Sequence, residues 1–325
     1  MKKLCIMHRA SIGDMLLATP VHRAVKETFP QCKLTVVTSP TGFELMNGSP
    51  YIDKLISYKK GDSVFKVFKN IWRADAAVIF DYSYRNALMA FLAAIPKRIG
   101  RGKNFINFKI APYPTEMFEP LKYLDMVKIL GIHTENFSLV RPVATAAEKL
   151  RVKKLCAEIK NVGQKLILIA PYSLSPLKDW RVENYHEIIS RLQKCGHVVA
   201  IIGGKNERER IEKNFPNIRN FAGETNLRES TELISQADLQ ICGCSSTLHL
   251  CSTTDTPSIA IYGPSSPAQW APRKNCTVIS RNVNCSPCYN VEGKSSCEER
   301  YCLNNISVEE VWSAVKKSLG GSNGF

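Results

Sequence analysis

The sequence of 325 residues contains no long apolar run. The longest candidates, at 87–95 and 166–170, fall short of the roughly 18 to 20 residues that a membrane-spanning helix needs. The start of the chain does not predict a signal peptide either, because His8 and Arg9 interrupt the apolar segment at 4–7. We therefore expect a cytoplasmic protein that does not span a membrane.

Two nucleotide-binding motifs are also missing. A dinucleotide site places Gly-x-Gly-x-x-Gly directly after a strand, but the first expected strand leads into residues 9–14, where Gly13 is the only glycine. The closest approach to a Walker A loop is Gly293-Lys294-Ser295, and Cys288 stands where its first glycine belongs. These absences argue against a dinucleotide oxidoreductase and leave no Walker A site.

The composition that is present is typical of a globular protein. With 44% hydrophobic and 22% charged residues, the chain can bury a large core, which excludes intrinsic disorder, and its length predicts two domains. Its 12 cysteines are spread along a chain without a leader, so we expect buried thiols rather than a disulfide framework.

The net charge of +15 is concentrated in one half of the chain. Residues 1–160 carry 26 Lys and Arg against 13 Asp and Glu, whereas residues 161–325 carry 18 against 16. This asymmetry predicts a polyanionic partner for the first half, unless the basic face is merely solvated. Aromatic and basic residues do not interleave in a nucleic-acid-binding motif, so an anionic membrane surface or a phosphorylated substrate is favoured over nucleic acid.

Apolar segments alternate with amphipathic ones in both halves. Strands are expected at 4–7, 33–38 and 76–80, and a helix from residue 12 places Leu16, Leu17, Val21 and Val25 on one face. The pattern restarts after a charged helix at 146–159, with a helix at 185–194 and strands at 165–170, 197–202, 239–242 and 258–262. The last three strands each lead into glycine, which lets the backbone approach a phosphate at a strand's carboxyl end. We expect two α/β domains with parallel sheets.

The segment from Gly13 to Pro20 resembles the N-terminal signature of family 9 glycosyltransferases, the lipopolysaccharide heptosyltransferases. Further matches follow in order at 49–53, 95–100, 178–180, 222–227, 245–249 and 262–270. In the segment 49–53, Ser49 stands where the family has asparagine. Each match is short, but their order along nearly the whole chain makes the resemblance specific.

The resemblance implies a GT-B fold, in which two Rossmann-like domains face each other across a cleft. Residues 1–159 would bind the acceptor and residues 160–325 the nucleotide sugar, with a last helix at about 306–319 packing back on the first domain. It also implies an inverting transfer of heptose from ADP-heptose to the inner core of lipopolysaccharide, without a metal or another cofactor. The partners would be the nucleotide sugar, a lipid-linked anionic saccharide and the cytoplasmic face of the inner membrane, where the enzyme is peripheral.

In the first domain, Asp14 matches the family's catalytic base. A carboxylate of this kind removes the proton of the acceptor hydroxyl, although an acid at a helix start is also favoured by the helix dipole alone. The densest basic run contains Lys97, Arg98, Arg101, Lys103 and Lys109. We expect it to bind the phosphorylated acceptor and the membrane surface.

In the second domain, Lys178 matches the family's phosphate-binding loop and would stabilise the departing diphosphate, with Ser173 as a hydroxyl donor. Backbone N–H groups at Ser245, Ser246 and Thr247 would bind phosphate at a helix N-terminus, or these residues are ordinary caps. Thr225 is expected near the base and Glu207 near the ribose, unless Glu207 is simply a surface residue. The remaining expected donor-binding residues are Gly203, Gly204, Cys244 and His249.

Two features leave alternatives open. Cys244 stands where many family members have an acid near the donor sugar, so the identity of the transferred sugar stays open. Cys285, Cys288, Cys297 and Cys302 suit a structural zinc site by residue type, but their spacing differs from compact zinc ribbons and favours buried or redox-paired thiols. Similar cysteines recur in heptosyltransferase II-like sequences, and we expect no catalytic metal.

Three rival functions remain at this stage. One is a family 9 transferase with another nucleotide sugar, and a second is a noncatalytic anionic-glycolipid-binding protein on the same fold, which Asp14 and Lys178 argue against. The third is a nucleotide-sugar epimerase, which would release free sugar without an acceptor. The acceptor linkage and the oligomeric state are not predicted.

Overall fold

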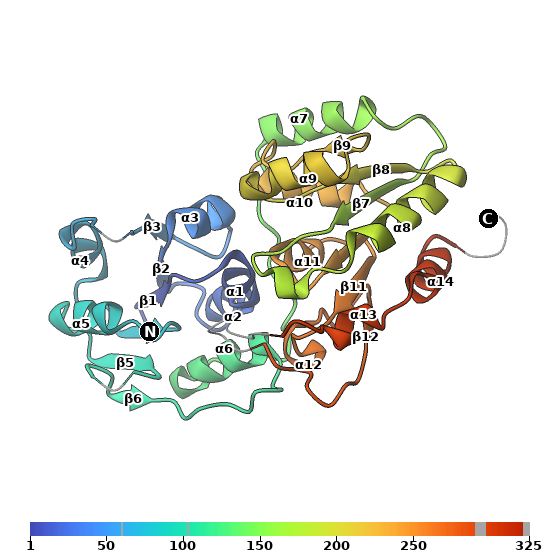
Figure 1. Cartoon of the computed structure of the whole chain (residues 1–325). Helices are drawn as coiled ribbons and strands as arrows, with labels where there is room; N and C mark the ends of the chain where they lie inside the picture. Colours follow the sequence, from blue (N-terminus) through green and yellow to red (C-terminus); the bar gives the residue numbers. More distant parts are fainter. Residues whose placement is uncertain (60, 103, 290–296, 321–325) are drawn as a thin grey trace. The chain divides into compact units, whose positions relative to one another are not determined.

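The computed structural model describes residues 1–59, 61–102, 104–289 and 297–320, which form two α/β units (Figure 1). Unit 1 comprises Met1–Val143 and unit 2 comprises Ala144–Phe325. The boundary lies before the position 159/160 predicted from the sequence, because the charged helix that follows Val143 packs on another helix of unit 2. Within the described ranges, no helix is long and apolar enough to cross a bilayer.

Unit 1 is built on a six-stranded parallel sheet of order β3-β2-β1-β4-β5-β6. The predicted strands at 4–7, 33–38 and 76–80 are confirmed as β1, β2 and β4. Its elements in chain order are β1 (Lys3–His8), α1 (Ile12–Leu17), α2 (Thr19–Thr28), β2 (Lys33–Thr38), α3 (Pro40–Met46), β3 (Lys54–Ser57), α4 (Phe65–Ile71), β4 (Ala76–Ile79), α5 (Tyr84–Leu92), β5 (Lys97–Gly100), β6 (Phe108–Lys109), α6 (Glu119–Val127) and the 3₁₀ turn Lys128–Leu130.

The helix predicted from residue 12 is divided in two at Ala18. Pro20 has no N–H to donate to the carbonyl of Leu16, and the hydroxyl of Thr19 donates to that oxygen instead at 2.6 Å. The apolar face is nevertheless buried as predicted, and it packs under the sheet through Leu16, Leu17, Val21 and Val25.

Unit 2 has a second six-stranded parallel sheet, of order β12-β11-β10-β7-β8-β9. The four strands and two helices predicted for this part of the chain are confirmed. Its elements are α7 (Ala146–Ala157), β7 (Leu166–Ala170), the 3₁₀ turn Pro176–Lys178, α8 (Val182–Lys194), β8 (Val198–Ile201), the 3₁₀ turn Lys205–Glu207, α9 (Arg208–Asn214), β9 (Arg219–Asn220), α10 (Leu227–Ser235), β10 (Leu239–Gly243), α11 (Ser246–Cys251), β11 (Ser258–Tyr262), α12 (Pro267–Trp270), β12 (Cys276–Ser280), α13 (Tyr301–Asn304) and α14 (Val308–Ser318).

The last helix, α14, packs within unit 2, on α8, β11 and β12. Its buried Val311 and Val315 join the core of that unit, and the indole N–H of Trp180 donates to the carbonyl of Ile306 at 3.1 Å. Within unit 2, the apolar face of α14 completes the core beside α8. The expected packing of this helix on the first domain stays a prediction.

Each sheet has one point at which the strand order reverses. In unit 1 the chain proceeds outward from β1 in one direction and from β4 in the other, and in unit 2 it does so from β7 and β10. At such a point the loops after the two central strands diverge and leave room for a ligand at the carboxyl ends. The loops that follow β1, β4, β7 and β10 are therefore the expected ligand-binding loops of the two sheets.

Candidate functional site

In unit 1, the loop after β1 carries Asp14 in the first turn of α1. Ser11 caps this helix: the N–H of Asp14 donates to the Ser11 hydroxyl at 3.3 Å, and that hydroxyl donates to a carboxylate oxygen of Asp14 at 2.7 Å. The carboxylate of Asp14 is half-buried and oriented by its own helix cap. Both functions considered from the sequence, helix-start carboxylate and base, are compatible with this geometry.

The loop after β4 carries Asp81, which the sequence analysis did not single out. The amide of Asn86 donates to both carboxylate oxygens of Asp81, at 3.1 and 2.9 Å, and the N–H of Ser83 donates at 3.2 Å. Burial raises the pKa of Asp81, although these donors oppose the effect. The N–H of Arg9, which follows β1, also donates to Asp81 at 3.4 Å, so this carboxylate links the loops after two neighbouring strands.

Asp14 and Asp81 share a neighbour in the buried side chain of Tyr123. Burial raises the pKa of Tyr123 first, and the charges of Asp14, Glu119 and Asp81 raise it further, while Arg101 lowers it. The ring of Tyr123 also packs against His8, at 5.3 Å between ring centroids. Residues from α1, from the loop after β4 and from α6 thus converge on one region.

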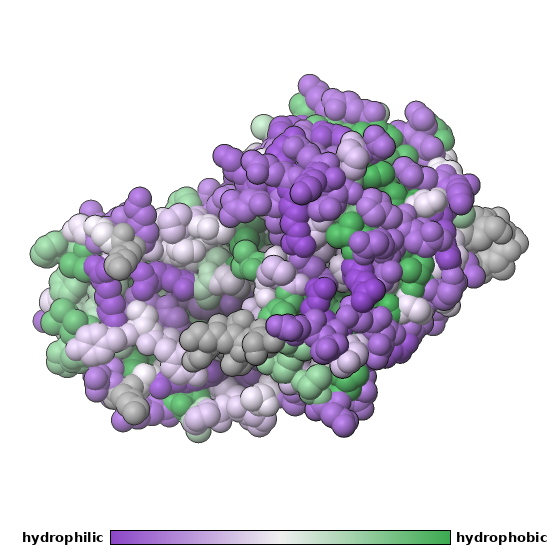
Figure 2. Space-filling model, in the orientation of Figure 1, coloured by the Kyte–Doolittle hydropathy of each residue, from purple (hydrophilic) through white to green (hydrophobic). Residues whose placement is uncertain are grey.

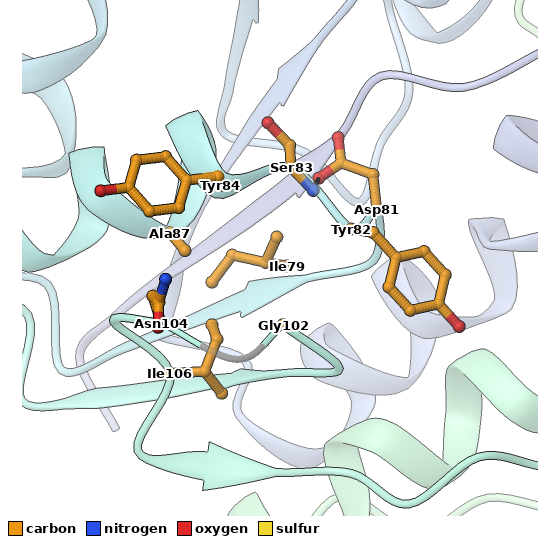
Figure 3. Close-up of a pocket in the computed structure, with 9 residues that line it drawn as sticks. All are labelled: Ile79, Asp81, Tyr82, Ser83, Tyr84, Ala87, Gly102, Asn104 and Ile106. Atoms are coloured by element: carbon orange, nitrogen blue, oxygen red, sulfur yellow. Dashed lines mark hydrogen bonds between the residues drawn. The ribbon is translucent and has the colours of Figure 1, made fainter.

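A pocket with a volume of about 160 Å³ opens beside Asp81 (Figure 3). The rings of Tyr82 and Tyr84 lie on either side of Asp81 and Ser83, and both rings are largely exposed. Aromatic rings flanking hydrogen-bonding groups are suited to a ligand with apolar faces and polar edges. The lining residues are Ile79, Asp81, Tyr82, Ser83, Tyr84, Ala87, Gly102, Asn104 and Ile106.

Several buried polar atoms near this edge of the sheet lack hydrogen bonds. Among the described residues, nothing pairs with Nε of Arg9 or Arg101, the hydroxyl of Tyr58 or Oδ1 of Asn86. Buried polar atoms are normally paired, so such a group of atoms indicates a polar ligand or ordered water. The guanidinium groups of Arg9 and Arg85 lie 5.5 and 5.3 Å from the Tyr58 ring and make the region strongly basic.

The basic run predicted at 97–109 separates into parts with different roles. Lys97 and Lys109 are exposed, whereas Arg98 is half-buried and donates to the carbonyls of Ile95 and Phe105, so it shapes its own loop. Arg101 lies at the pocket, where it contacts the hydroxyl of Tyr82 at 3.4 Å. Its guanidinium also lies over the Tyr113 ring, 4.5 Å from the centroid. Lys103 lies outside the described residues.

In unit 2, the loop after β7 is organised by Asp179, which the sequence analysis did not single out. Its carboxylate accepts hydrogen bonds from the N–H and the hydroxyl of Ser173, at 2.9 and 3.1 Å, and from Arg210 at 2.9 Å. The hydroxyl of Ser173 also lies 2.8 Å from the carbonyl of Ser175. Ser173 therefore stabilises the loop, and its expected donation to phosphate stays a prediction.

Lys178 ends this loop and lies beside the carboxyl end of β10. Its ammonium group is 4.4 Å from the ring centroid of Tyr289. A Cβ atom on Gly243 would come within 3.2 Å of the carbonyl oxygen of Lys178, so glycine permits this close approach. Burial, followed by the charge of Lys178, lowers the pKa of His249 to about 4, so His249 is neutral at pH 7.

The loop after β10 leads into α11. Ser245 occupies the N-cap position, but its hydroxyl pairs with that of Thr247 at 2.8 Å rather than with the helix backbone. The first N–H groups of α11, from Ser246 onward, are thus without a side-chain cap in the described structure. Cys244, which directly precedes Ser245, is buried. The pKa of the Tyr262 phenol is raised mainly by burial, and Cys244 raises it further.

The remaining predicted donor residues lie after β8 and before α10. Glu207 bends back so that its carboxylate accepts from the N–H of Gly204 at 2.7 Å, and a Cβ on Gly203 would approach the same carboxylate within 2.6 Å. This interaction closes the turn, and the contact of Glu207 with ribose stays a prediction. Thr225 is half-buried and pairs with the hydroxyl of Ser230 at 2.8 Å.

Three of the four C-terminal cysteines act electrostatically on the fourth, Cys302. Burial raises the pKa of Cys302, and Cys288, Cys285 and Cys297 raise it further. All four are free thiols, and no group of three or more His, Cys, Asp or Glu within the described ranges is arranged to hold a metal ion.

The two doubly wound parallel sheets, each with candidate ligand-binding loops at its reversal point, are those of the GT-B fold. The chain belongs to glycosyltransferase family 9 (heptosyltransferase), whose sequence profile matches residues 64–298. The lipopolysaccharide core heptosyltransferase OpsX of Haemophilus influenzae is 25% identical and aligns over 97% of this chain and 96% of its own length.

Solved structures agree with the fold. A family 9 glycosyltransferase from Veillonella parvula has a TM-score of 0.86 at 20% identity and covers 99% of this chain and 98% of its own. The E. coli ADP-heptose lipopolysaccharide heptosyltransferase II has a TM-score of 0.80 at 21% identity and covers 98% of both chains.

Proposed function

We propose that this glycosyltransferase moves a heptose from ADP-heptose to the inner core of lipopolysaccharide. The observation that carries the proposal is the full-length similarity to a lipopolysaccharide core heptosyltransferase, together with a fold shared with an enzyme described as an ADP-heptose transferase. The reaction belongs to a family whose profile covers most of the chain.

In the proposed reaction, Asp14 is the base that removes the proton of the acceptor hydroxyl. Ser11 fixes the carboxylate, and the pocket beside Asp81 accepts the saccharide. Tyr82 and Tyr84 would stack on sugar rings, while Arg101 pairs with an anionic substituent. A positioned base of this kind contributes about 10² to 10⁴ in rate.

The donor is proposed to bind unit 2 through its diphosphate. Lys178 and the N–H groups at the start of α11 would stabilise the charge that develops as the glycosidic bond breaks, and the proposed reaction uses no metal ion or other cofactor. A single displacement by the acceptor hydroxyl inverts the anomeric centre. His249, neutral at pH 7, serves as a hydrogen-bonding group rather than a cation.

A different nucleotide sugar is the one alternative with an observation of its own. Cys244 presents a buried thiol where many family members have an acid, so a hydroxyl group of the donor sugar is recognised differently here. A noncatalytic glycolipid-binding protein is the outcome to expect if no sugar is transferred at all.

The acceptor is proposed to be reached at the cytoplasmic face of the inner membrane, with the protein bound peripherally. The excess of 13 positive charges in residues 1–160, 26 Lys and Arg against 13 Asp and Glu, supports this location because the leaflet and the acceptor are both anionic.

The experiment that tests the proposal is a panel of nucleotide sugars, each incubated with and without a truncated lipopolysaccharide acceptor. We expect ADP release only with ADP-heptose and acceptor together. Release from another donor would identify a different transferase, free sugar without acceptor would indicate an epimerase, and binding of acceptor without any release would favour the noncatalytic alternative.

A further inference from the structure

Five large apolar side chains stand exposed together on unit 1, and we call them the α4–α5 patch. They lie on α4, on α5 and at the residues adjoining α4. Their exposed fractions are 40% for Val64, 73% for Phe65, 45% for Trp72, 47% for Phe91 and 56% for Leu92. Figure 2 shows apolar atoms at the surface where these two helices lie.

The two helices that carry the patch are neighbours, and their C-terminal ends meet. α4 packs on α5, and the N–H of Arg73 donates to the carbonyl of Ala93 at 2.9 Å, which brings the end of α4 to the end of α5. Each helix already buries an inner face in the core, through Val67 and Ile71 on α4 and through Ala87 and Ala90 on α5. The exposed residues form a second apolar face that the core does not use.

Two basic side chains lie over aromatic rings of the patch: the guanidinium of Arg73 is 5.9 Å from the Trp72 ring centroid and that of Arg98 is 5.3 Å from the Phe91 ring centroid. Residues 64–98 contain two acids, and both are engaged elsewhere: Asp75 accepts from the backbone N–H groups of Lys2 and Lys3, and Asp81 is bound to Asn86. The basic residues of the same segment are Lys66, Lys69, Arg73, Arg85, Lys97 and Arg98.

We propose that the α4–α5 patch docks on an anionic membrane surface, with Phe65, Trp72 and Leu92 in the headgroup region and the lysines of α4 on lipid phosphates. The proposal specifies the surface behind the peripheral location, so it rests on that part of the proposed function. Aromatic and aliphatic side chains ringed by lysine and arginine are characteristic of interfacial helices, whereas lysine is depleted in protein interfaces. This composition favours a lipid surface over a second copy of the chain.

The test is sedimentation of the full chain with vesicles of phosphatidylethanolamine and phosphatidylglycerol, compared with phosphatidylcholine alone. The apolar variant is Phe65→Ser with Leu92→Ser, and the charge variant is Lys66→Gln with Lys69→Gln. We expect the apolar variant to bind anionic vesicles at least about tenfold more weakly. Each lysine removed should cost about fivefold in the partition coefficient, and the loss should shrink at high salt.

Matched controls lie on unit 2. Val162 is a fully exposed aliphatic residue, and Lys153 and Lys154 are exposed lysines of α7. Val162→Ser and the pair Lys153→Gln with Lys154→Gln should bind vesicles as the wild type does. If these controls lost as much binding as the patch variants, or if all proteins bound phosphatidylcholine equally well, the proposal would be overturned.

Two further readouts complete the test. Transfer to a soluble, delipidated saccharide should be unchanged in both patch variants, and an absence of transfer in every protein, with the vesicle results as expected, would refute the proposed reaction while supporting the docking surface. Sedimentation velocity measures self-association. A wild-type dimer that the apolar variant dissociates, with vesicle binding unaltered, would assign the patch to a second copy and overturn the proposal.

Discussion

Replacing Asp179 by asparagine tests whether hydrogen bonds to the Asp179 carboxylate fix the loop that carries Lys178. In the wild type Oδ1 of Asp179 accepts from the N–H and the hydroxyl of Ser173, and Oδ2 accepts from Arg210. Either orientation of the amide brings its NH₂ group against a donor, Arg210 or the N–H of Ser173. One hydrogen bond to a charged group is therefore lost, which costs about 1.5 to 3 kcal/mol when both partners are buried.

Two effects reduce that cost. The Arg210 side chain is 44% exposed, so water replaces much of the lost interaction. Burial also raises the pKa of Asp179 despite Arg210, which means that the carboxylate bears a desolvation cost that an amide does not. We expect a net loss of about 1 kcal/mol, or about 2 to 4 °C in melting temperature for a unit of this size.

The assay compares melting temperature with donor affinity. The amide oxygen should stay with the charged Arg210, which turns the NH₂ group towards the N–H of Ser173 and removes its acceptor. Asp179→Asn should therefore weaken binding of ADP-heptose about tenfold, which corresponds to about 1.4 kcal/mol. Arg210→Gln removes the ion pair but keeps both Ser173 contacts, so it should lower the melting temperature similarly and leave donor affinity nearly unchanged. Equal loss of donor affinity in the two variants would refute the assignment of Asp179 as the residue that positions the loop.

Three further predictions address separate parts of the molecule. Arg228 holds the pKa of Glu148 at about 2 rather than 4.5, so Glu148 stabilises the fold fully above pH 4.5 and loses that effect as the pH falls towards 2. Glu148→Gln should lower the free energy of unfolding at pH 7 by about 2 kcal/mol after allowance for solvent, and the difference between variant and wild type should shrink below pH 4.5 and close near pH 2. A difference in the free energy of unfolding that does not change with pH would contradict this prediction. Lys178→Ala should reduce kcat/KM for the donor by roughly 10² to 10³, and wild-type turnover would remove Lys178 from the site. Tyr82→Ala should raise the KM for the saccharide acceptor up to about tenfold while donor affinity stays unchanged; a shift in donor affinity instead would place Tyr82 elsewhere in the mechanism.

The fold was largely predictable because buried parallel strands leave a strong local signal. β7 and β8 are nearly continuous apolar runs, as is expected for strands covered on both faces. β3 and β5 were not predicted, because each has only four residues and begins with a lysine, Lys54 or Lys97, so neither forms an apolar run. The domain boundary was misplaced because α7 is charged on most of its surface, and only its contacts with α10 show that it belongs to unit 2.

The candidate site was predictable only where a motif marked it. Asp14 and Lys178 stand in recognisable segments, and the structure places each after a central strand of its sheet. Asp81 and Asp179 were missed as site residues because their importance lies in what they hold, namely Asn86 and Ser173, and such partnerships depend on tertiary contacts. A signal was present for Asp81, since a carboxylate directly follows a buried strand.

The central claim is tested most directly by Asp14→Asn, with sugar transfer and donor affinity measured on the same protein. Asparagine keeps the shape of the carboxylate and still accepts a hydrogen bond from Ser11, but it does not act as a base. We expect an unchanged melting temperature and dissociation constant for ADP-heptose, with transfer to the lipopolysaccharide acceptor reduced by about 10² to 10⁴. Transfer at the wild-type rate would contradict this expectation and leave Asp14 as a helix-start carboxylate.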